Sequence, residues 1–425
     1  MSDRVVVVGG GVVGLCVAYY CARKGRSVTV FERGEPERDG CSFANAGMVV
    51  PSHIVPLASP GVVALGLRHL WNPESPFHVQ PRVSADLVDW GWKLGRAATR
   101  EHVERSAPLL RDLHLASRAC YEALAAQSDN AFDLVENGLL MLCTTEHGLA
   151  EESEAAAYAR HLGIPADELT AAEVAAREPA LRMNVTGAVY YRQDAHLSPG
   201  RLMATLQRET ARLGVELRHR TEIRGWRTQA DRVVGVETSD GVTNADEFVL
   251  CAGIWSSALG RRLGLALPMQ AGKGYSLTVA QPPALPRICS IMNEARVAVT
   301  PMGTSLRFGG TMEITGIDDS VHPARIRGIV KSVAACFPDV TRAHLDAATV
   351  RTGLRPCSPD GLPYVGRAGR FANLSVATGH AMMGVSLAPI TGKLIAELLA
   401  GEAPSLALGA LDPDRFAAPT AARAA

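Results

Sequence analysis

Apolar and polar positions at the start of the chain predict a strand, a helix and a second strand. Residues 5–8 are four valines, a run typical of a short strand that is buried on both faces of a parallel sheet. Three glycines follow, and the apolar residues after them predict a helix that begins near Gly11 and ends at Lys24-Gly25. Residues 27–31 predict a second strand. This order indicates the first unit of a parallel sheet.

The same stretch could be mistaken for a membrane segment. Residues 5–22 carry no charge, so hydropathy alone would make them a membrane span or a signal core. However, each of the three glycines weakens the centre of a helix by about 1 kcal/mol relative to alanine. The helical half has only about half of the ~20 apolar residues that a span needs. We therefore expect no span here, and no other stretch is long enough.

From residue 139 onward the pattern changes to short strands at hairpin spacing, which predicts a second, mostly antiparallel part. These strands are expected at residues 138–143, 187–191, 275–279, 296–300 and 306–311. Periodic apolar spacing predicts helices at residues 85–98, 102–126, 199–213, 323–336 and 385–399. Two more strands, at residues 232–238 and 247–251, are joined by a turn at Asp240-Gly241 and assigned to the first part.

We therefore expect an α/β (α+β) chain in which a Rossmann-type nucleotide-binding domain is interleaved with a mostly antiparallel β-sheet substrate domain. The nucleotide-binding domain is predicted to be discontinuous, with residues 1–82, 195–260 and 353–416. The substrate domain is predicted at residues 83–194 and 261–352, and residues 417–425 are expected to form a flexible tail. The active site is expected between the domains, where ligand sites often form.

Composition and charge narrow the class of protein. The 425 residues are 47% hydrophobic and 20% charged, as in globular proteins, and 43 basic residues balance 43 acidic ones. Because this balance provides no broad attraction to nucleic acid, we expect a small-molecule partner. The nine cysteines include no C-x-x-C pair, which predicts free thiols in a reducing compartment and no metal. A cytoplasmic location is expected, with peripheral contact at the inner face of the membrane left open.

A nucleotide-binding motif follows the first strand. Gly9, Gly11 and Gly14 stand in G-x-G-x-x-G register, which permits a tight turn, close approach of a pyrophosphate and packing of the next helix. Glu32 lies 23 residues beyond Gly9, at the end of the second strand, where a carboxylate accepts hydrogen bonds from ribose hydroxyls. Because this carboxylate would repel a 2′-phosphate, we expect NAD or FAD rather than NADP. The alternative is a glycine-rich turn beside a surface glutamate.

A second dinucleotide site is not expected. Gly272-Lys273-Gly274 and Gly309-Gly310 both lack the third glycine and the following helix of such a motif. Reductases that bind two dinucleotides carry two complete motifs. The sequence therefore predicts one dinucleotide.

Four further stretches carry a family pattern. They read C-S-F-A-N-A-G-M-V-V-P-S with P-L-A-S-P-G after it (41–61), V-L-C-A-G-I-W-S (249–256), T-G-L-R-P-C-S-P-D-G-L-P (352–363) and A-T-G-H-A-M-M-G-V-S-L-A-P (377–389). In this order they resemble the bacterial FAD-dependent D-amino acid dehydrogenases, within the D-amino acid oxidase, glycine oxidase and sarcosine oxidase superfamily. The chain departs from that pattern at Met48, where broad-specificity dehydrogenases have a polar residue, and at Ala381, where a glycine is usual.

The resemblance implies one noncovalently bound FAD and oxidation of a D-amino acid, in which hydride passes from Cα to the flavin and leaves an imino acid. The electrons would then pass to an acceptor such as a quinone or an electron-transfer protein. The cofactor contacts that it implies are Gly9, Gly11, Val12, Val13, Gly14, Glu32, Arg33, Ser42, Ala44, Asn45, Gly47, Met48, Ala252, Gly253, Gly379, His380, Met383, Gly384 and Val385. A helix from Gly384 would direct its positive end at the pyrimidine edge of the flavin.

Amine oxidation also needs groups that hold the substrate. Arg355 in G-L-R-P is the candidate for the substrate carboxylate, because a guanidinium binds a carboxylate bidentately, and a surface or ion-pair role is the alternative. Tyr275 in G-K-G-Y-S is a candidate for a hydroxyl on the same carboxylate, and a core tyrosine is its alternative. His53 is a candidate base or a structural histidine, since a correctly oriented neutral amine needs no base.

The substrate and the acceptor are left with alternatives. Residues 48–61 and 72–77 resemble the D-hydroxyproline dehydrogenase subgroup, so D-proline or cis-4-hydroxy-D-proline is favoured. A broad-specificity D-amino acid dehydrogenase and an oxygen-using amine oxidase of the glycine or sarcosine oxidase type are the alternatives. A flavin-binding protein without amine chemistry is the remote one, since the balanced charge supplies no basic surface. The oligomeric state is left open.

Overall fold

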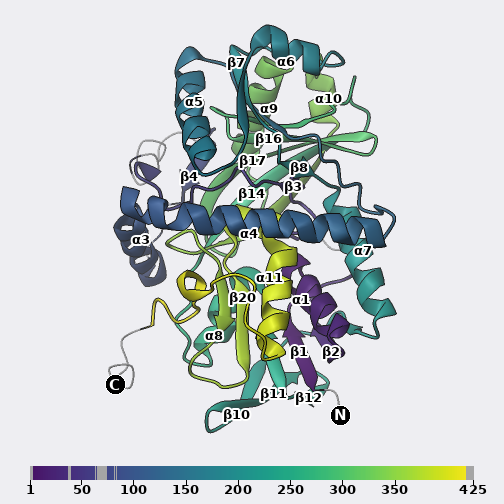
Figure 1. Ribbon diagram of the computed structural model, residues 1–425, viewed down its shortest axis with the longest axis vertical. Coiled ribbons are helices and arrows are strands. Elements are labelled where there is room, and N and C mark those ends of the chain that lie inside the picture. The colour runs from purple at the N-terminus through teal and green to yellow at the C-terminus, as the bar shows by residue number, and fades with distance from the viewer. Residues whose placement is uncertain are drawn as a thin grey trace.

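The chain folds around two large β-sheets with helices packed against them. The computed structural model describes residues 3–36, 40–62, 64, 74–80, 82 and 84–417. Figure 1 shows the long helix α4 (Arg100–Gln127) running across the middle of the molecule, between a half that contains α5, α6 and α9 and a half that contains α1, α11 and β1. The fold is thus α/β, as the sequence predicts.

The first sheet contains the predicted strand, helix and strand. Its six strands have the order β19 (Tyr364–Arg367), β20 (Leu374–Thr378), β13 (Glu247–Leu250), β1 (Arg4–Val8), β2 (Ser27–Phe31) and β9 (Glu216–Arg218). All neighbours are parallel except β19 and β20. The four valines of β1 are buried, as expected for a central strand with both faces covered. One face packs against α1 (Val12–Arg23) and α11 (Gly384–Leu399).

A small sheet covers the other face. It consists of β10 (Gly225–Gln229), β11 (Arg232–Thr238) and β12 (Gly241–Asn244), and Val233 and Val236 of β11 pack against Phe248 of β13. The turn at Asp240-Gly241 joins β11 to β12. The prediction that this turn leads into the strand at residues 247–251 was therefore wrong, because β12 pairs back on β11 before the chain enters the large sheet.

The second large sheet is mostly antiparallel, as predicted. Its order is β18 (Thr349–Cys357), β14 (Gln270–Val279), β17 (Ser305–Thr315), β16 (Val297–Met302), β15 (Cys289–Met292), β5 (Leu139–Cys143), β7 (Gly187–Tyr191) and β6 (Ala166–Thr170), with β4 (Phe77–Val79) beside β17. Only the pairs β5–β15 and β4–β17 are parallel among the described residues. The short strands β3 (Met48–Val49) and β8 (Ala195–His196) pair with each other.

Helices pack against both large sheets. Four of them lie near predicted positions: α3 (Ala85–Ala97), α4, α7 (Pro199–Arg212) and α9 (Pro323–Cys336). The helices α5 (Glu146–His161) and α6 (Ala171–Arg177) were not predicted from the sequence. Thr170 and Glu173 form a capping box at the start of α6, so the letters T-A-A-E were a local signal for this helix. The remaining short helices are η1 (Gly253–Trp255), α8 (Ser256–Arg261), α10 (Arg342–Asp346), η2 (Ala381–Met383) and η3 (Gly409–Leu411).

The division into two domains stays a proposal. Residues 77–79 and 353–357 lie in the second large sheet, although the predicted boundaries assign them to the nucleotide-binding domain. Both segments stand at a predicted domain boundary, where the chain crosses from one half to the other. Residues 418–425 of the predicted tail lie outside the described residues.

One apolar helix was not anticipated as a membrane candidate. Within the described residues, the helical segment Ala381–Leu399 is long and apolar enough to cross a membrane, although the sequence analysis found no stretch of that length beyond the first strand and helix. Of this window, 78% is buried inside the molecule. The apolar character of this segment is therefore explained by its position in the core, where α11 packs against α1.

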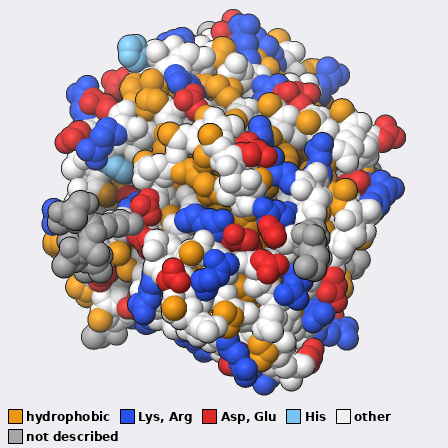
Figure 2. Space-filling view, turned by 60° about the horizontal axis from the view of Figure 1, so that its bottom comes forward, with side chains coloured by type: hydrophobic (Ala, Val, Ile, Leu, Met, Phe, Trp, Pro, Cys, Tyr) orange, Lys and Arg blue, Asp and Glu red, His pale blue; other side chains and the backbone are white. Residues whose placement is uncertain are grey.

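The surface carries both signs of charge. Figure 2 shows acidic and basic side chains interspersed on one face, with small groups of apolar side chains between them. This agrees with the balance of 43 basic and 43 acidic residues. No single-sign field covers this face.

Candidate functional site

The glycine turn between β1 and α1 is built so that one of its glycines faces open space. A Cβ atom on Gly14 would lie 1.9 Å from the carbonyl oxygen of Gly9, so this glycine is needed for the helix to pack on the turn. Gly9 itself has a φ of +107°, which favours glycine. In contrast, a Cβ on Gly11 would meet only Ser42 Oγ, at 3.5 Å. Gly11 is therefore the position at which a ligand can approach the backbone.

Glu32 is held at the end of β2 by the same turn. Its Oε2 accepts a hydrogen bond from the Gly10 N–H and its Oε1 accepts one from the Gly34 N–H, both at 2.8 Å. Beside it, the Arg33 guanidinium lies 3.8 Å from the ring centre of Trp255. The Glu32 carboxylate and the stacked Arg33 and Trp255 side chains thus lie close together. The carboxylate suits the hydroxyls of a ribose, and the planar stacked groups suit an adenine ring.

These groups open into one large cavity of about 610 Å³. Thirteen of the predicted cofactor contacts line it: Gly9, Gly11, Val12, Val13, Glu32, Arg33, Ser42, Asn45, Ala252, Gly253, His380, Gly384 and Val385. Others that line it were not predicted, among them Trp255, Thr221, Glu222, Ile223, Thr352, Leu354 and Pro356. The cavity thus runs from the glycine turn of the first sheet to strand β18 of the second.

Six of the predicted cofactor contacts are not among the residues that form the cavity wall. Gly14, Ala44, Gly47, Met48, Gly379 and Met383 do not line the cavity. Gly47 has a φ of +75° and donates its N–H to Asn45 Oδ1 at 2.7 Å, so it turns the loop that carries Asn45. Met383 packs inward, with its sulfur 3.3 Å from His114 Nε2.

The far end of the cavity is formed by the start of α11. Gly384 and Val385 line it, so the N-terminal end of α11, whose first N–H groups have no partner within the helix, stands at the cavity wall. His380 stands beside them with its Nε2 bonded to Thr391 Oγ1 at 2.9 Å and its buried Nδ1 without a partner in the structure. Burial lowers the pKa of His380 to about 4, so the ring is neutral at pH 7. His380 therefore adds a neutral, almost fully buried side chain to the wall.

Arg355 projects from β18 next to this cavity. The backbone of Arg355 pairs with Gly272 of β14, and a Cβ on the nearby Gly274 would lie 2.2 Å from Arg355 Nη2. The guanidinium therefore lies flat over Gly274, in space that any side chain would fill. Its Nη1 donates to the carbonyl oxygen of Thr311 at 2.7 Å.

A β-bulge directs that carbonyl. Lys273 pairs with Glu313 and Tyr275 pairs with Gly310, so one residue of β14 faces two of β17. Thr311, inside the bulge, has a φ of +67°, which is strained for a β-branched residue. The strained backbone of Thr311 therefore lies at the residue whose carbonyl oxygen accepts the hydrogen bond from Arg355.

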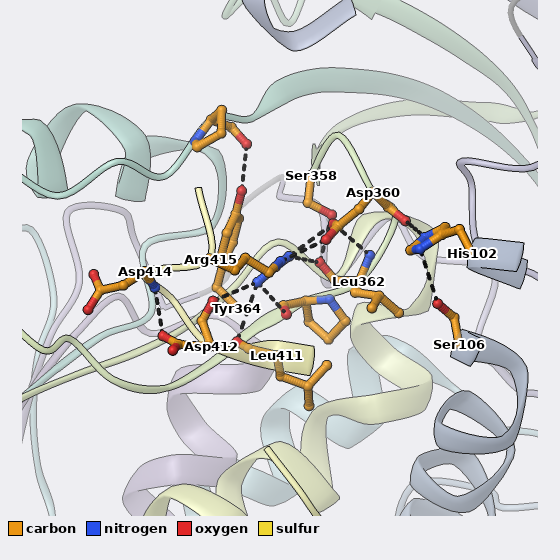
Figure 3. A network of polar contacts seen from close by, with 12 residues as sticks. His102, Ser106, Ser358, Asp360, Leu362, Tyr364, Leu411, Asp412, Asp414 and Arg415 are labelled. Atoms are coloured by element: carbon orange, nitrogen blue, oxygen red, sulfur yellow. Dashed lines mark hydrogen bonds and ion pairs between the residues drawn. The ribbon is translucent and has the colours of Figure 1, made fainter. Parts of the chain in front are cut away.

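The turn after Arg355 is also fixed. Arg415 holds both carboxylate oxygens of Asp360, at 2.7 and 3.0 Å, and its Nη2 donates to the Leu362 carbonyl oxygen at 2.7 Å, as Figure 3 shows. From the other side His102 Nε2 lies 2.8 Å from the Asp360 carbonyl oxygen. Arg355 is therefore carried on a strand whose exit is braced by two distant side chains.

Replacing Gly274 by alanine should displace the Arg355 guanidinium. The added methyl would overlap Nη2, so we expect the KM of a carboxylate substrate to rise about tenfold to a hundredfold, from a strain of roughly 1–3 kcal/mol. Gly272→Ala is the matched control, because its methyl would meet Met312 and Cys357 instead. Steady-state kinetics of both variants would measure this, and equal KM values in the two would contradict it.

Tyr275 is not brought to Arg355. It is 1% exposed in the apolar cluster on the opposite face of the second sheet, with Phe308 and Ile329. Burial raises the pKa of Tyr275, and its hydroxyl donates to Glu313 Oε2 at 2.8 Å. The alternative that Tyr275 is a core tyrosine therefore agrees with the structure. The motif alone does not indicate the face of the sheet on which the side chain lies.

His53 lies in a buried polar chain away from the cavity wall. Its Nδ1 is 3.2 Å from Ser52 Oγ, and Ser52 bonds Asp194 through both its N–H, at 3.0 Å, and its hydroxyl. Burial lowers the pKa of His53 to about 4, so it is a weak base at neutral pH. Burial raises the pKa of Asp194 to about 7.

The raised pKa of Asp194 predicts a pH-dependent stability. In the unfolded chain this carboxyl ionises near pH 4, whereas in the folded chain it ionises near pH 7, so the folded state loses stability as pH rises between these values. We expect the unfolding free energy to fall by about 2–4 kcal/mol from pH 4 to pH 8 relative to the Asp194→Asn variant. Denaturant unfolding at both pH values measures this, and parallel curves for the two proteins would disprove it.

No group of three or more His, Cys, Asp or Glu side chains that could hold a metal ion occurs in the described part of the chain. The polar groups of the cavity fit a dinucleotide instead. A glycine opening, a ribose-type carboxylate and a second helix N-terminus stand along one continuous cavity. Fold and site together fit the class of dinucleotide-binding proteins.

The comparisons agree with this class. The profile of the FAD dependent oxidoreductase family matches residues 4–398, and the chain belongs to this family. A "D-amino acid dehydrogenase" of Methylobacterium radiotolerans is 37% identical, covering 98% of this chain and all of the relative. Another of that name, from Granulibacter bethesdensis, is 32% identical over 95% of this chain and 97% of its own.

Solved structures share the fold. Glycine oxidase from Geobacillus kaustophilus superposes with a TM-score of 0.78 at 27% identity, covering 97% of this chain and 99% of its own. L-proline dehydrogenase from P. horikoshii gives a TM-score of 0.74 at 19% identity over 98% of both chains, which shows the fold alone. The chain is thus an FAD-dependent oxidoreductase that acts on a small molecule and passes its electrons to an acceptor.

Proposed function

We propose that the protein is a D-amino acid dehydrogenase in which Arg355 binds the substrate carboxylate. The observation that carries this is the guanidinium lying over Gly274, next to strand positions that line the cofactor cavity. An arginine in such a fixed place can hold a carboxylate bidentately and thereby determine the face of Cα that is oxidised. Relatives named D-amino acid dehydrogenase at 32% and 37% identity over nearly the full length support the same activity.

In this proposal the chain orients the substrate and shields it. FAD, when bound, accepts the hydride from Cα. Gly9, Gly11 and Glu32 would hold the adenosine and pyrophosphate part, and Gly384 and Val385 would place the positive end of α11 at the opposite end of the cavity. That helix end favours negative charge beside it.

The proposal uses no side-chain base. His53 has its pKa lowered to about 4 and does not line the cavity, and Tyr275 donates its hydroxyl to Glu313. Arg355 therefore stands as the group that binds substrate, and the amine is oxidised in its neutral form. His380 would stand at the wall beside the cofactor as a neutral side chain, with its Nε2 bonded to Thr391.

We favour D-proline or cis-4-hydroxy-D-proline as the substrate. This rests on the loop at residues 48–61, whose sequence resembles that subgroup; residues 72 and 73 of the second stretch lie outside the described residues. A cyclic secondary amine would yield a pyrroline-2-carboxylate, and a primary amine would yield a 2-oxo acid and ammonia after hydrolysis.

Anaerobic bleaching of the flavin tests the activity and the substrate together. D-proline, cis-4-hydroxy-D-proline, D-alanine, sarcosine and the L-enantiomers would each be mixed with holoenzyme, and the loss of visible absorbance would be followed. We expect the two D-prolines to reduce the flavin fastest. Faster reduction by D-alanine would favour broad specificity, and reduction by L-forms alone would refute the proposal.

An oxygen-using amine oxidase is the second candidate. It is supported by glycine oxidase, whose structure superposes over nearly the whole of both chains at 27% identity. Turnover in air with a peroxide assay separates the two. Peroxide formed at the rate of substrate oxidation would identify an oxidase, whereas turnover that needs an added quinone or dye would identify a dehydrogenase.

We propose that FAD is bound noncovalently. The cysteines that line the cavity are Cys41 and Cys251, and burial raises the pKa of both thiols, which keeps them protonated and poorly nucleophilic. Acid precipitation should leave all of the yellow colour in the supernatant. Colour retained in the pellet would show a covalent link.

A further inference from the structure

The residue after His380 has an unusual backbone. Ala381 has a φ of +47°, in the left-handed region that a residue with a Cβ rarely occupies. Its side chain is only 4% exposed. A glycine would adopt this conformation without strain, so the methyl group is kept here at the expense of stability. Strained residues of this kind concentrate at functional sites.

The methyl lies on the boundary between the cofactor cavity and the face that carries Arg355. Ala381 lines the cavity. It also packs in an apolar cluster with Ala58, Trp90, Met312 and Cys357. Cys357 is two residues from Arg355 and therefore points to the same face of β18, and its backbone forms a bridge with that of His380. The Ala381 methyl thus lies between the cofactor cavity and the face of β18 that carries Arg355. A substrate has to reach both.

We infer that Ala381 determines specificity, by narrowing the space for the substrate side chain to small or compact amino acids such as D-alanine and D-proline. This rests on the proposed function, since it requires the substrate carboxylate to lie on Arg355. A side chain that extends from Cα as a long or aromatic group meets the Ala381 methyl.

The test is the Ala381→Gly variant of the holoenzyme. Its kcat/KM would be measured for D-alanine, D-proline, D-leucine and D-phenylalanine. Removing one methyl from an apolar pocket changes discrimination by about 10–200-fold, so we expect the ratio of D-phenylalanine or D-leucine to D-alanine to rise at least tenfold. The melting temperature should rise as well, because the strained φ is relieved.

Ala230→Gly is the matched control. Ala230 has a φ of +51° but is exposed in the turn between β10 and β11, away from the cavity. The same substitution at the same backbone conformation should raise the melting temperature and leave the substrate ratios unchanged.

The outcomes are distinct. If the wild type oxidises D-amino acids and Ala381→Gly has unchanged ratios, the inference is wrong and the proposed function stands. If Ala230→Gly changes the ratios equally, the effect is not local and the inference also fails. If the wild type oxidises no D-amino acid, the proposed function fails and the inference falls with it.

Discussion

Replacing Arg355 by alanine should raise the KM for a D-amino acid by about two to three orders of magnitude. The substrate carboxylate would lose a charge-assisted pair in a partly buried place, where removing one partner costs roughly 3–5 kcal/mol. Thr311 would also lose the donor that its strained carbonyl now meets at 2.7 Å. Steady-state kinetics with D-proline and D-alanine would measure the change.

Two controls make the result specific to substrate binding. Arg355→Lys keeps the charge but loses the planar two-point contact, so its KM should lie between those of the wild type and the alanine variant. The FAD content of all three proteins should be equal, since Arg355 is not among the residues that line the cofactor cavity. A normal KM in the Arg355→Ala variant would contradict the assignment of Arg355 to the substrate carboxylate.

Replacing Gly11 by alanine should weaken FAD binding about tenfold to a hundredfold while leaving the fold of the apoprotein intact. Among the described residues its added methyl would meet only Ser42 Oγ, at 3.5 Å, but it would occupy the space that a pyrophosphate needs. Overpacking of this kind costs roughly 1–3 kcal/mol. Titration of apoprotein with FAD, followed by flavin fluorescence, gives the dissociation constant.

Gly14→Ala separates cofactor binding from folding. A methyl here would lie 1.9 Å from the Gly9 carbonyl oxygen, so the apoprotein itself should be destabilised. Thermal unfolding without FAD should therefore distinguish the two variants, with Gly11→Ala close to the wild type. If Gly11→Ala bound FAD normally, the pyrophosphate would have to lie elsewhere.

The parts of the fold that depend on neighbours in sequence were predictable. The strand β1, the helix α1 and the strand β2 are each specified by a run of apolar residues and a glycine break, and all three were found within a residue or two of their predicted ends. The pairing of β11 with β12 was not predicted, because β12 (Gly241–Asn244) is mostly exposed and has no apolar run. Helix α5 has many alanines and glutamates and only a weak apolar stripe.

The candidate site divides in the same way. Gly9, Gly11 and Glu32 were identified because their spacing along the chain carries the geometry. Thr221 and Ile223 line the cavity only because β9 pairs with β2, and no motif marks them. Tyr275 was misplaced relative to Arg355 because its direction depends on strand register and a bulge in the partner strand.

The brace on the Asp360 turn comes from a segment outside the cofactor cavity. The described residues that line the cofactor cavity end at Val385, whereas the guanidinium that holds the turn after Arg355 belongs to Arg415. A chain that is cut after α11 should therefore keep every one of those dinucleotide contacts and lose the clamp. We expect such a chain to hold the coenzyme but to have a looser grip on the substrate carboxylate.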